Sequence, residues 1–149
     1  MNNYLSIITL NVNGLNATIK RHRIAEWIRK HDPNICCLQE THLRTKDLQR
    51  LKVKGWKQIF QADRQEKKAG VAIRISDKID FQRRAIKRDP EGHFIILKGR
   101  IHQELINIVN IYAPNMGAPK YIKKILEDFK KYMDSNTITV GYLTPHCRK

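Results

Sequence analysis

The most constraining feature of this sequence is a pair of short apolar runs with a helical segment between them. Residues 5–10 and 35–38 are rich in β-branched and other apolar side chains, as in buried strands. Residues 18–31 carry apolar side chains at helical spacing, with Thr18 as the expected N-cap and residues 32–34 as the stop. A strand, a helix and a strand in this order form a βαβ unit, so the two strands are expected to be parallel.

The hydrophobic pattern changes after residue 55. Short segments rich in β-branched and aromatic residues follow one another, separated by turn residues and without helices between them, which favours antiparallel pairing. These segments are residues 56–61, 70–75, 79–86, 94–101 and 105–112. Residues 121–132 then have the apolar spacing of a helix, and residues 137–141 are expected to form a last strand. The chain therefore predicts an α/β domain with a mixed sheet.

The charge of the chain restricts its partners. Its 149 residues include 29 Lys and Arg but only 14 Asp and Glu, a formal net charge of +15. The basic residues are distributed along the whole chain, so the folded surface itself is expected to be basic. An anionic partner follows, with nucleic acid the commonest class and an anionic membrane surface the second. Solvated cations kept for solubility are the alternative.

Length and cysteine content limit the compartment. The chain is long enough for one domain, and no apolar run approaches the roughly 20 residues that span a bilayer. The apolar N-terminus lacks the basic flank of a signal peptide. Cys36, Cys37 and Cys147 are odd in number and lack zinc-site spacing, which indicates buried thiols in a reducing compartment. We expect a nuclear or cytoplasmic protein that is not secreted and has no membrane partner.

Two polar residues follow the first two predicted strands. Asn11 comes directly after the first strand, and Glu40 follows the second. Because the carboxyl ends of parallel strands meet at one edge of a sheet, both side chains are expected there. A carboxylate beside an amide on a basic protein suits Mg²⁺, which takes one or two carboxylates together with phosphate oxygens. The alternative is that both residues only begin loops.

Four motifs in this order resemble the endonuclease/exonuclease/phosphatase superfamily. They are TLNVNGL at residues 9–15, LQETH at 38–42, KKAGVA at 67–72 and NIYAPN at 110–115. More closely, they resemble the N-terminal endonuclease of LINE-type non-LTR retrotransposon ORF2 polyproteins, which is similar to AP endonuclease and exonuclease III. The resemblance extends over residues 4–141 and implies a four-layered α/β sandwich.

The resemblance also implies Mg²⁺-dependent nicking of DNA, with no small-molecule cofactor besides the metal. It implies that Asn11 orients phosphate and metal-bound groups, that Glu40 binds the metal and that Tyr112 contacts the scissile phosphate. Asn11 and Tyr112 are then the catalytic residues, neutral donors beside a cation that absorbs developing charge. Tyr112 as a plain core residue is the alternative. The expected nucleic-acid contacts are Arg21, Arg23, Lys67, Lys68 and Asn115.

The resemblance fails near the C-terminus. The family continues with Gly-Asp-Phe-Asn-Thr-Pro, but here the matching residues are GYLTP, so Tyr142 stands in place of the Asp. The family's later Asp and its Ser-Asp-His segment have no counterpart, and His146 does not replace that His. We expect the C-terminal third of the domain to be missing and catalysis to be impaired. A non-enzymatic basic nucleic-acid-binding module and a non-functional retrotransposon remnant are the alternatives.

Residues 142–149 have a pattern of their own. They fit an Asp→Tyr change at 142 followed by a one-base deletion in DNA that encodes the family motif. This predicts an aberrant tail, frameshifted from residue 143, that the coding DNA would reveal. The missing third further predicts one sheet that is nearly complete and a second that is largely absent. Residues 106–111 would then expose an apolar face, and residues 137–140 an open edge, so that the chain aggregates or melts without cooperativity.

Overall fold

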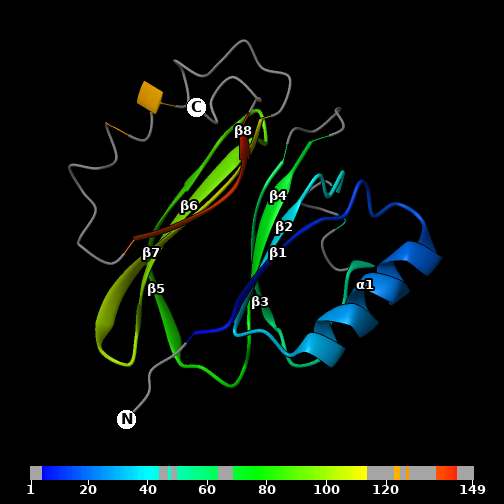
Figure 1. The fold of residues 1–149 in the computed structure, drawn as a ribbon, viewed down its shortest axis with the longest axis horizontal. Coiled ribbons are helices and arrows are strands. Elements are labelled where there is room, and N and C mark those ends of the chain that lie inside the picture. The colour runs from blue at the N-terminus through cyan, green and yellow to red at the C-terminus, as the bar shows by residue number, and fades with distance from the viewer. Residues whose placement is uncertain are drawn as a thin grey trace.

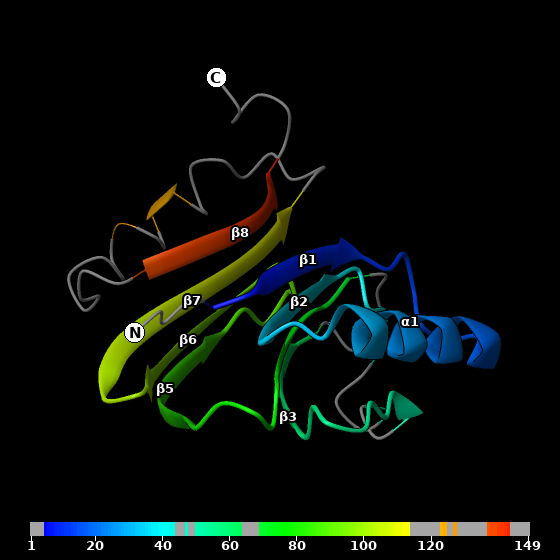
Figure 2. The same ribbon diagram turned by 60° about the horizontal axis from the view of Figure 1, so that its bottom comes forward.

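The structure contains two four-stranded sheets that face each other and one long helix. It is a computed structural model, and it describes residues 5–43, 47, 50–63, 69–113, 123–124, 127 and 137–143. Helix α1 covers the outer face of the first sheet, and the second sheet lies against the inner face (Figures 1 and 2). The elements are β1 (Ile7–Asn11), α1 (Thr18–His31), β2 (Ile35–Gln39), β3 (Gln58–Ala62), β4 (Val71–Ile75), β5 (Phe81–Arg88), β6 (Phe94–Ile101), β7 (Glu104–Ala113) and β8 (Thr137–Leu143).

The first sheet has the strand order β1-β2-β4-β3. Strands β1 and β2 are parallel, in a register that runs from Ile7 opposite Ile35 to Asn11 opposite Gln39. Strand β4 pairs antiparallel with both β2 and β3. The predicted βαβ unit is therefore confirmed, because α1 connects the two parallel strands. The mixed α/β fold is confirmed with it.

The ends of α1 differ in part from the expectation. The helix begins at Thr18 and is preceded by Ala17, which makes no side-chain capping bond. Thr18 is thus the first helical residue rather than the N-cap, and its Oγ1 instead accepts a bond of 3.1 Å from Arg21 Nη2. The expected stop is confirmed at Asp32, which adopts the left-handed conformation and donates its N–H to the carbonyl of Ile28 at 2.8 Å.

The second sheet has the order β5-β6-β7-β8 and ends on a parallel pair. Strand β8 lies beside β7 from Thr137 opposite Asn107 to Leu143 opposite Ala113. The strand therefore continues two residues past the expected end at residue 141, and the frameshifted tail stays a prediction. The helix expected at residues 121–132 lies outside the described residues, apart from 123, 124 and 127.

A continuous apolar core fills the space between the two sheets. Ile35 and Ile73 of the first sheet pack with Leu97 and Ile108 of the second, and all four are fully buried. The expected bare apolar face on residues 106–111 is therefore wrong. The physical reason is that β5–β8 form a four-stranded second sheet that packs on the first, so each sheet buries the apolar face of the other. Among the described strands of this sheet, β5 and β8 lie at the edges, as expected for β8.

The opposite face of β2 is buried as well. Cys36 and Leu38 point away from the intersheet core and pack with Ile28 of α1 and with Trp56. This double burial explains why β2 is apolar throughout instead of alternating. Burial raises the pKa of both cysteine thiols, Cys36 to about 12, so they are inert small side chains. No helix in the described ranges combines the length and apolarity that crossing a bilayer requires.

Truncation of the intersheet core should destabilise the domain measurably. Ile108→Ala removes a fully buried side chain and should lower the free energy of unfolding by about 2–5 kcal/mol. The matched control is Ile19→Ala on α1, where the side chain is 62% exposed and the change should stay within about 0.5 kcal/mol. Urea unfolding followed by circular dichroism measures both, and equal midpoints for the two variants would contradict this core.

Candidate functional site

The candidate site lies at the carboxyl ends of β1 and β2. Beyond the strands, the two loops that follow β1 and β2 remain joined by backbone hydrogen bonds. Val12 donates to the carbonyl of Gln39 at 2.9 Å, Gly14 to that of Glu40 at 2.6 Å, and Leu15 to that of Thr41 at 2.9 Å. These bonds fix both loops, so the polar side chains that follow the strands are held close together.

Three side chains expected at the site meet here. Asn11 Nδ2 donates a hydrogen bond of 2.7 Å to Glu40 Oε2. The hydroxyl of Tyr112, which comes from β7 in the other sheet, is also hydrogen-bonded to the Glu40 carboxylate. The expected clustering of these residues is thus confirmed, and it joins the two sheets. Asn11 is exposed, whereas Glu40 and Tyr112 are half-buried, so the group faces an open edge.

The environment of Glu40 favours its ionised form. Burial by itself raises the pKa of this carboxyl, but hydrogen bonds from Tyr112 and Asn11 outweigh it, together with the nearby His42. The net effect is a pKa below the ordinary value. His42 Nε2 lies 3.7 Å from Glu40 Oε1. Glu40 itself has φ 54°, in the left-handed region, as have Asn13 and His42, so both loops at this edge hold strained backbone.

The donor set suits a hard cation. An ionised carboxylate at an open edge can bind Mg²⁺, which commonly uses one or two carboxylates and completes its shell with water and phosphate oxygens. The Asn11 carbonyl oxygen is already engaged, because Oδ1 accepts the N–H of Asn13 at 2.9 Å. Glu40 is therefore the residue that would hold the ion. In the described part of the chain, no group of three or more His, Cys, Asp and Glu side chains forms a metal cluster.

A buried polar bridge lies directly beneath this edge. Asn110 of β7 is fully buried, and its Nδ2 donates to the carbonyls of Leu38 and Ala72 in the first sheet, both at 3.0 Å. Its Oδ1 accepts from Gln39 Nε2 at 3.0 Å. Asn110 precedes Tyr112 by two residues and Gln39 precedes Glu40 by one. The bridge therefore sets the separation between the strands that carry Tyr112 and Glu40.

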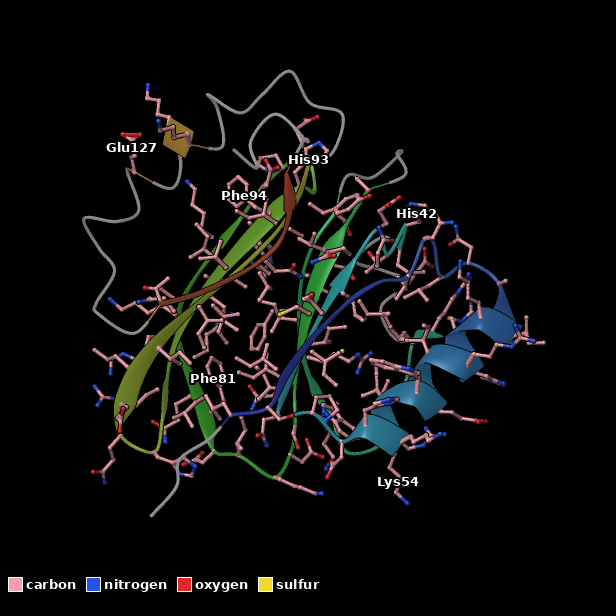
Figure 3. The ribbon with its side chains drawn as sticks, in the orientation of Figure 1. His42, Lys54, Phe81, His93, Phe94 and Glu127 are labelled. Carbon is pink, nitrogen blue, oxygen red and sulfur yellow. The ribbon has the colours of Figure 1, made fainter. Side chains whose placement is uncertain are left out.

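The turn between β5 and β6 lies next to the candidate site and is bonded to both sheets. His93 accepts the N–H of Tyr112 at its backbone carbonyl, at 2.7 Å, and Gly92 accepts that of Gly70 at 3.1 Å. The buried Asp89 carboxylate organises the turn by accepting the backbone N–H groups of Glu91 and His93. Figure 3 shows His42 and His93 at the same end of the two sheets.

Sequence analysis assigned no role to several residues of this site. Asn110 had a usable signal, because it is an amide inside an otherwise apolar strand, and buried amides need partners. Gln39 and His42 stand inside a recognised motif, but their contacts depend on the other sheet and on the loop conformation. His93 and Asp89 sit in a predicted turn that gave no sign of its distance from the site.

The expected nucleic-acid contacts have different environments. Arg21 uses Nη1 to bind the carbonyls of Leu15 and Asn16 at 2.9 and 2.7 Å, and Nη2 to bind Thr18. Its guanidinium therefore stabilises the loop before α1, and its charge acts on a ligand mainly at a distance. Arg23 is exposed on α1. The remaining expected contacts lie outside the described residues: Lys67, Lys68 and Asn115.

Residues 8–137 match the Endonuclease/Exonuclease/phosphatase family. The chain belongs to this family. It is 26% identical over 132 residues to the Transposon TX1 uncharacterized 149 kDa protein of Xenopus laevis, a match that covers 88% of this chain and 10% of that protein. It is also 46% identical over 44 residues to the DNA repair nuclease APEX1 of Danio rerio, which covers 30% of this chain and 14% of that nuclease.

The family fold is also seen in solved structures. D. rerio TDP2 complexed with single strand DNA product superposes with a TM-score of 0.68 at 14% identity, over 92% of this chain and 58% of that chain. At this identity the similarity shows the fold alone. The chain spans a small fraction of the two curated relatives and a little over half of the TDP2 structure.

The hydrogen bonds at Glu40 predict a measurable electrostatic response. Tyr112→Phe and Asn11→Ala should each raise the pKa of Glu40, because each removes a donor to the carboxylate. The pKa of Glu40 in the folded protein is lowered, so its ionised carboxylate stabilises the fold at pH values above the ordinary pKa of 4.5. This stability is lost as the pH falls through the pKa of the folded state. Carboxyl ¹³C titration by NMR measures the shift. The exposed Gln82→Ala serves as control, and no rise in the two site variants would contradict the arrangement.

The buried bridge predicts a large stability effect. Asn110→Leu preserves the approximate volume but leaves two carbonyls and the Gln39 amide without their partner, which should cost at least about 3 kcal/mol. The same substitution at the exposed Asn16 should change stability by about 0.5 kcal/mol or less. Chemical denaturation compares the two, and a loss below about 1 kcal/mol in Asn110→Leu would show that the bridge is dispensable.

Proposed function

We propose that this chain carries the metal- and phosphate-binding edge of a LINE-type DNA endonuclease, and that its own nicking activity is low. The observation that carries the proposal is the hydrogen-bonded group of Asn11, Glu40 and Tyr112 at an open edge. A net charge of +15 supports a polyanionic substrate. The substrate would be DNA and the cation Mg²⁺, in a nuclear or cytoplasmic setting.

Each residue of the group has a distinct task in this proposal. Glu40 would hold Mg²⁺ through its ionised carboxylate, and the ion would supply charge stabilisation at the phosphodiester. Asn11 donates one amide N–H to the Glu40 carboxylate and accepts the backbone N–H of Asn13 at its Oδ1. Its second amide N–H is then left for a phosphate oxygen. Tyr112 supplies a neutral hydroxyl from the opposite sheet, so the phosphate meets donors without added negative charge.

Similarity to known proteins supports the choice of substrate. One relative is a DNA repair nuclease, one is a transposon protein, and one structure with the same fold is complexed with a single-stranded DNA product. These are properties of those proteins. Their transfer to this chain is supported by the residues that match the family motifs, Asn11, Glu40 and Tyr112.

Tyr142 is the reason to expect low activity. The LINE-type motif has an Asp at this position, and the backbone of Tyr142 pairs with Tyr112 in the β7–β8 ladder. A phenol, with an ordinary pKa near 10, is neutral at physiological pH and offers no carboxylate to a metal or a water molecule. Glu40 would then bind Mg²⁺ with few protein ligands, and affinity and turnover would both be low.

A second candidate is a nucleic-acid-binding module without catalysis. The same two observations favour it, since the +15 charge persists while Tyr142 replaces a family carboxylate. Binding that weakens steeply with salt, together with intact supercoiled plasmid in Mg²⁺, would identify this function. Absence of the endogenous protein from cells by mass spectrometry would instead favour a retrotransposon remnant.

Restoration of the family carboxylate tests the proposed endonuclease site. Tyr142→Asp should tighten Mg²⁺ binding at Glu40 by roughly tenfold, about 1.4 kcal/mol, and should raise Mg²⁺-dependent nicking of supercoiled plasmid above that of the unchanged chain. Chemical-shift titration of Glu40 and gel analysis of the plasmid measure the two effects.

Two further variants serve as matched controls for this experiment. Tyr142→Asn makes the same change of size without the charge and should leave Mg²⁺ affinity low. Glu40→Gln in the Tyr142→Asp background should return nicking to that of the unchanged chain. Nicking that persists in this double variant, or Mg²⁺ that does not perturb Glu40, would contradict the proposed site.

A further inference from the structure

Two hollows lined by cations lie beside α1. The first, of about 450 Å³, is lined by Arg21 and His22 of α1 and by Arg50 and Lys52. The second, also of about 450 Å³, is lined by Lys52, Lys54 and Lys57 around an apolar floor. Lys52 borders both hollows, so they are neighbours on the surface. We call this part of the surface the basic track, formed by Arg21, His22, Arg50, Lys52, Lys54 and Lys57.

The basic track leads away from the candidate site. Arg21 and His22 lie in the first turns of α1, and Arg21 binds the loop that follows β1. Figure 3 shows Lys54 near one end of α1 and His42 near the opposite end. Helix α1 has 14 residues and is about 21 Å long at 1.5 Å per residue. The track therefore begins near the catalytic edge and continues along the outer side of the molecule.

The track carries an excess of positive charge. Five of its six residues are Lys or Arg. The carboxylate of Asp47 lies 3.6 Å from Arg50 Nε and partly compensates that charge. Within the described ranges, no ion pair connects Lys52, Lys54 or Lys57 to a carboxylate. These three side chains are exposed, so their ammonium groups can meet an anion without losing an internal partner.

Buried side chains hold the backbone of the segment that carries these lysines. Arg74 of β4 is buried and donates through Nη1 to the carbonyl of Trp56 at 2.9 Å, and through Nη2 to that of Leu51. Trp56 Nε1 donates to the carbonyl of Pro33 at 2.8 Å. Segment 51–56 is thus tied to both the sheet and the end of α1. The backbone that carries the lysines is held in place before a ligand arrives, which reduces the backbone part of the ordering cost of binding.

We propose that the basic track binds the phosphate backbone of a nucleic acid that extends beyond the catalytic edge. This inference rests on the proposed function for its choice of nucleic acid as the partner. It adds a contact surface that is separate from the candidate site. One strand of a duplex presents a phosphate about every 3.4 Å, and such a row of anions matches a row of cations better than an isolated anion would. Neutralisation of these phosphates releases counterions and makes the affinity strongly dependent on salt.

Salt-dependent binding tests the track without catalysis. Fluorescence anisotropy with a labelled duplex of about 20 base pairs, in EDTA and between about 50 and 200 mM salt, gives the slope of log K against log salt. The triple variant Lys52→Gln, Lys54→Gln, Lys57→Gln should reduce the magnitude of this slope by about 2–3, at about 0.9 per lost phosphate contact. The control triple Arg83→Gln, Arg84→Gln, Lys87→Gln removes the same charge from exposed positions on β5 and should change the slope by less than about 1.

The outcomes separate this inference from the proposed catalytic site. The slope comparison is made in EDTA and needs no catalysis, so failure of plasmid nicking leaves it unaffected. Equal slope changes in the two triples would show that only net charge matters and would overturn the track. If polyglutamate binds as tightly as the duplex, and the track variant loses the same affinity for both, the choice of nucleic acid is overturned. Urea unfolding midpoints equal to that of the unchanged chain verify that both triples are folded.

Discussion

The architecture of this domain depends on one buried amide. Asn110 in β7 donates to two carbonyls of the opposite sheet and accepts from Gln39, at the end of the intersheet core where apolar packing gives way to the open edge. Apolar contacts are not directional, so they hold the two sheets together without defining their offset. Hydrogen bonds are directional and costly to leave unmade in a buried place. The amide therefore fixes how the sheets meet, and with it the position of every side chain above it.

The polar group at the edge follows from that constraint. Glu40 and Tyr112 come from different sheets, and each lies one or two residues beyond a partner in the bridge. The bonds that lower the pKa of Glu40 thus come from both halves of the sandwich, which makes ionisation of this carboxylate a property of the assembled fold. The same fold tolerates Tyr142 within the β7–β8 ladder, because backbone pairing does not depend on the family carboxylate.

The positive charge of the chain also has an arrangement outside the candidate site. The +15 excess could be distributed evenly, yet around α1 several cations border two neighbouring hollows, and buried Arg74 fastens the backbone beneath them. Local sequence shows Lys52, Lys54 and Lys57 as ordinary surface lysines. The proximity of Arg50 and Lys52 to Arg21 and His22 arises only because segment 50–57 packs beside α1 on the same sheet face (Figure 2).

Much of the outcome was determined by the sequence itself. Apolar runs, helical spacing and turn residues give local preferences, so the βαβ unit, the meander and the placement of Asn11 and Glu40 at neighbouring strand ends could be predicted, and the motifs identified the family. The four-stranded second sheet could not, since the pairing of β8 with β7 is a contact between distant segments. Tertiary structure alone decided the Thr18 side-chain contact with Arg21, the Asn110 bridge, the hydroxyl of Tyr112 on Glu40 and the neighbouring hollows beside α1. Periodicity encodes which face of an element is buried, whereas only the assembled core determines which buried or half-buried polar groups find one another.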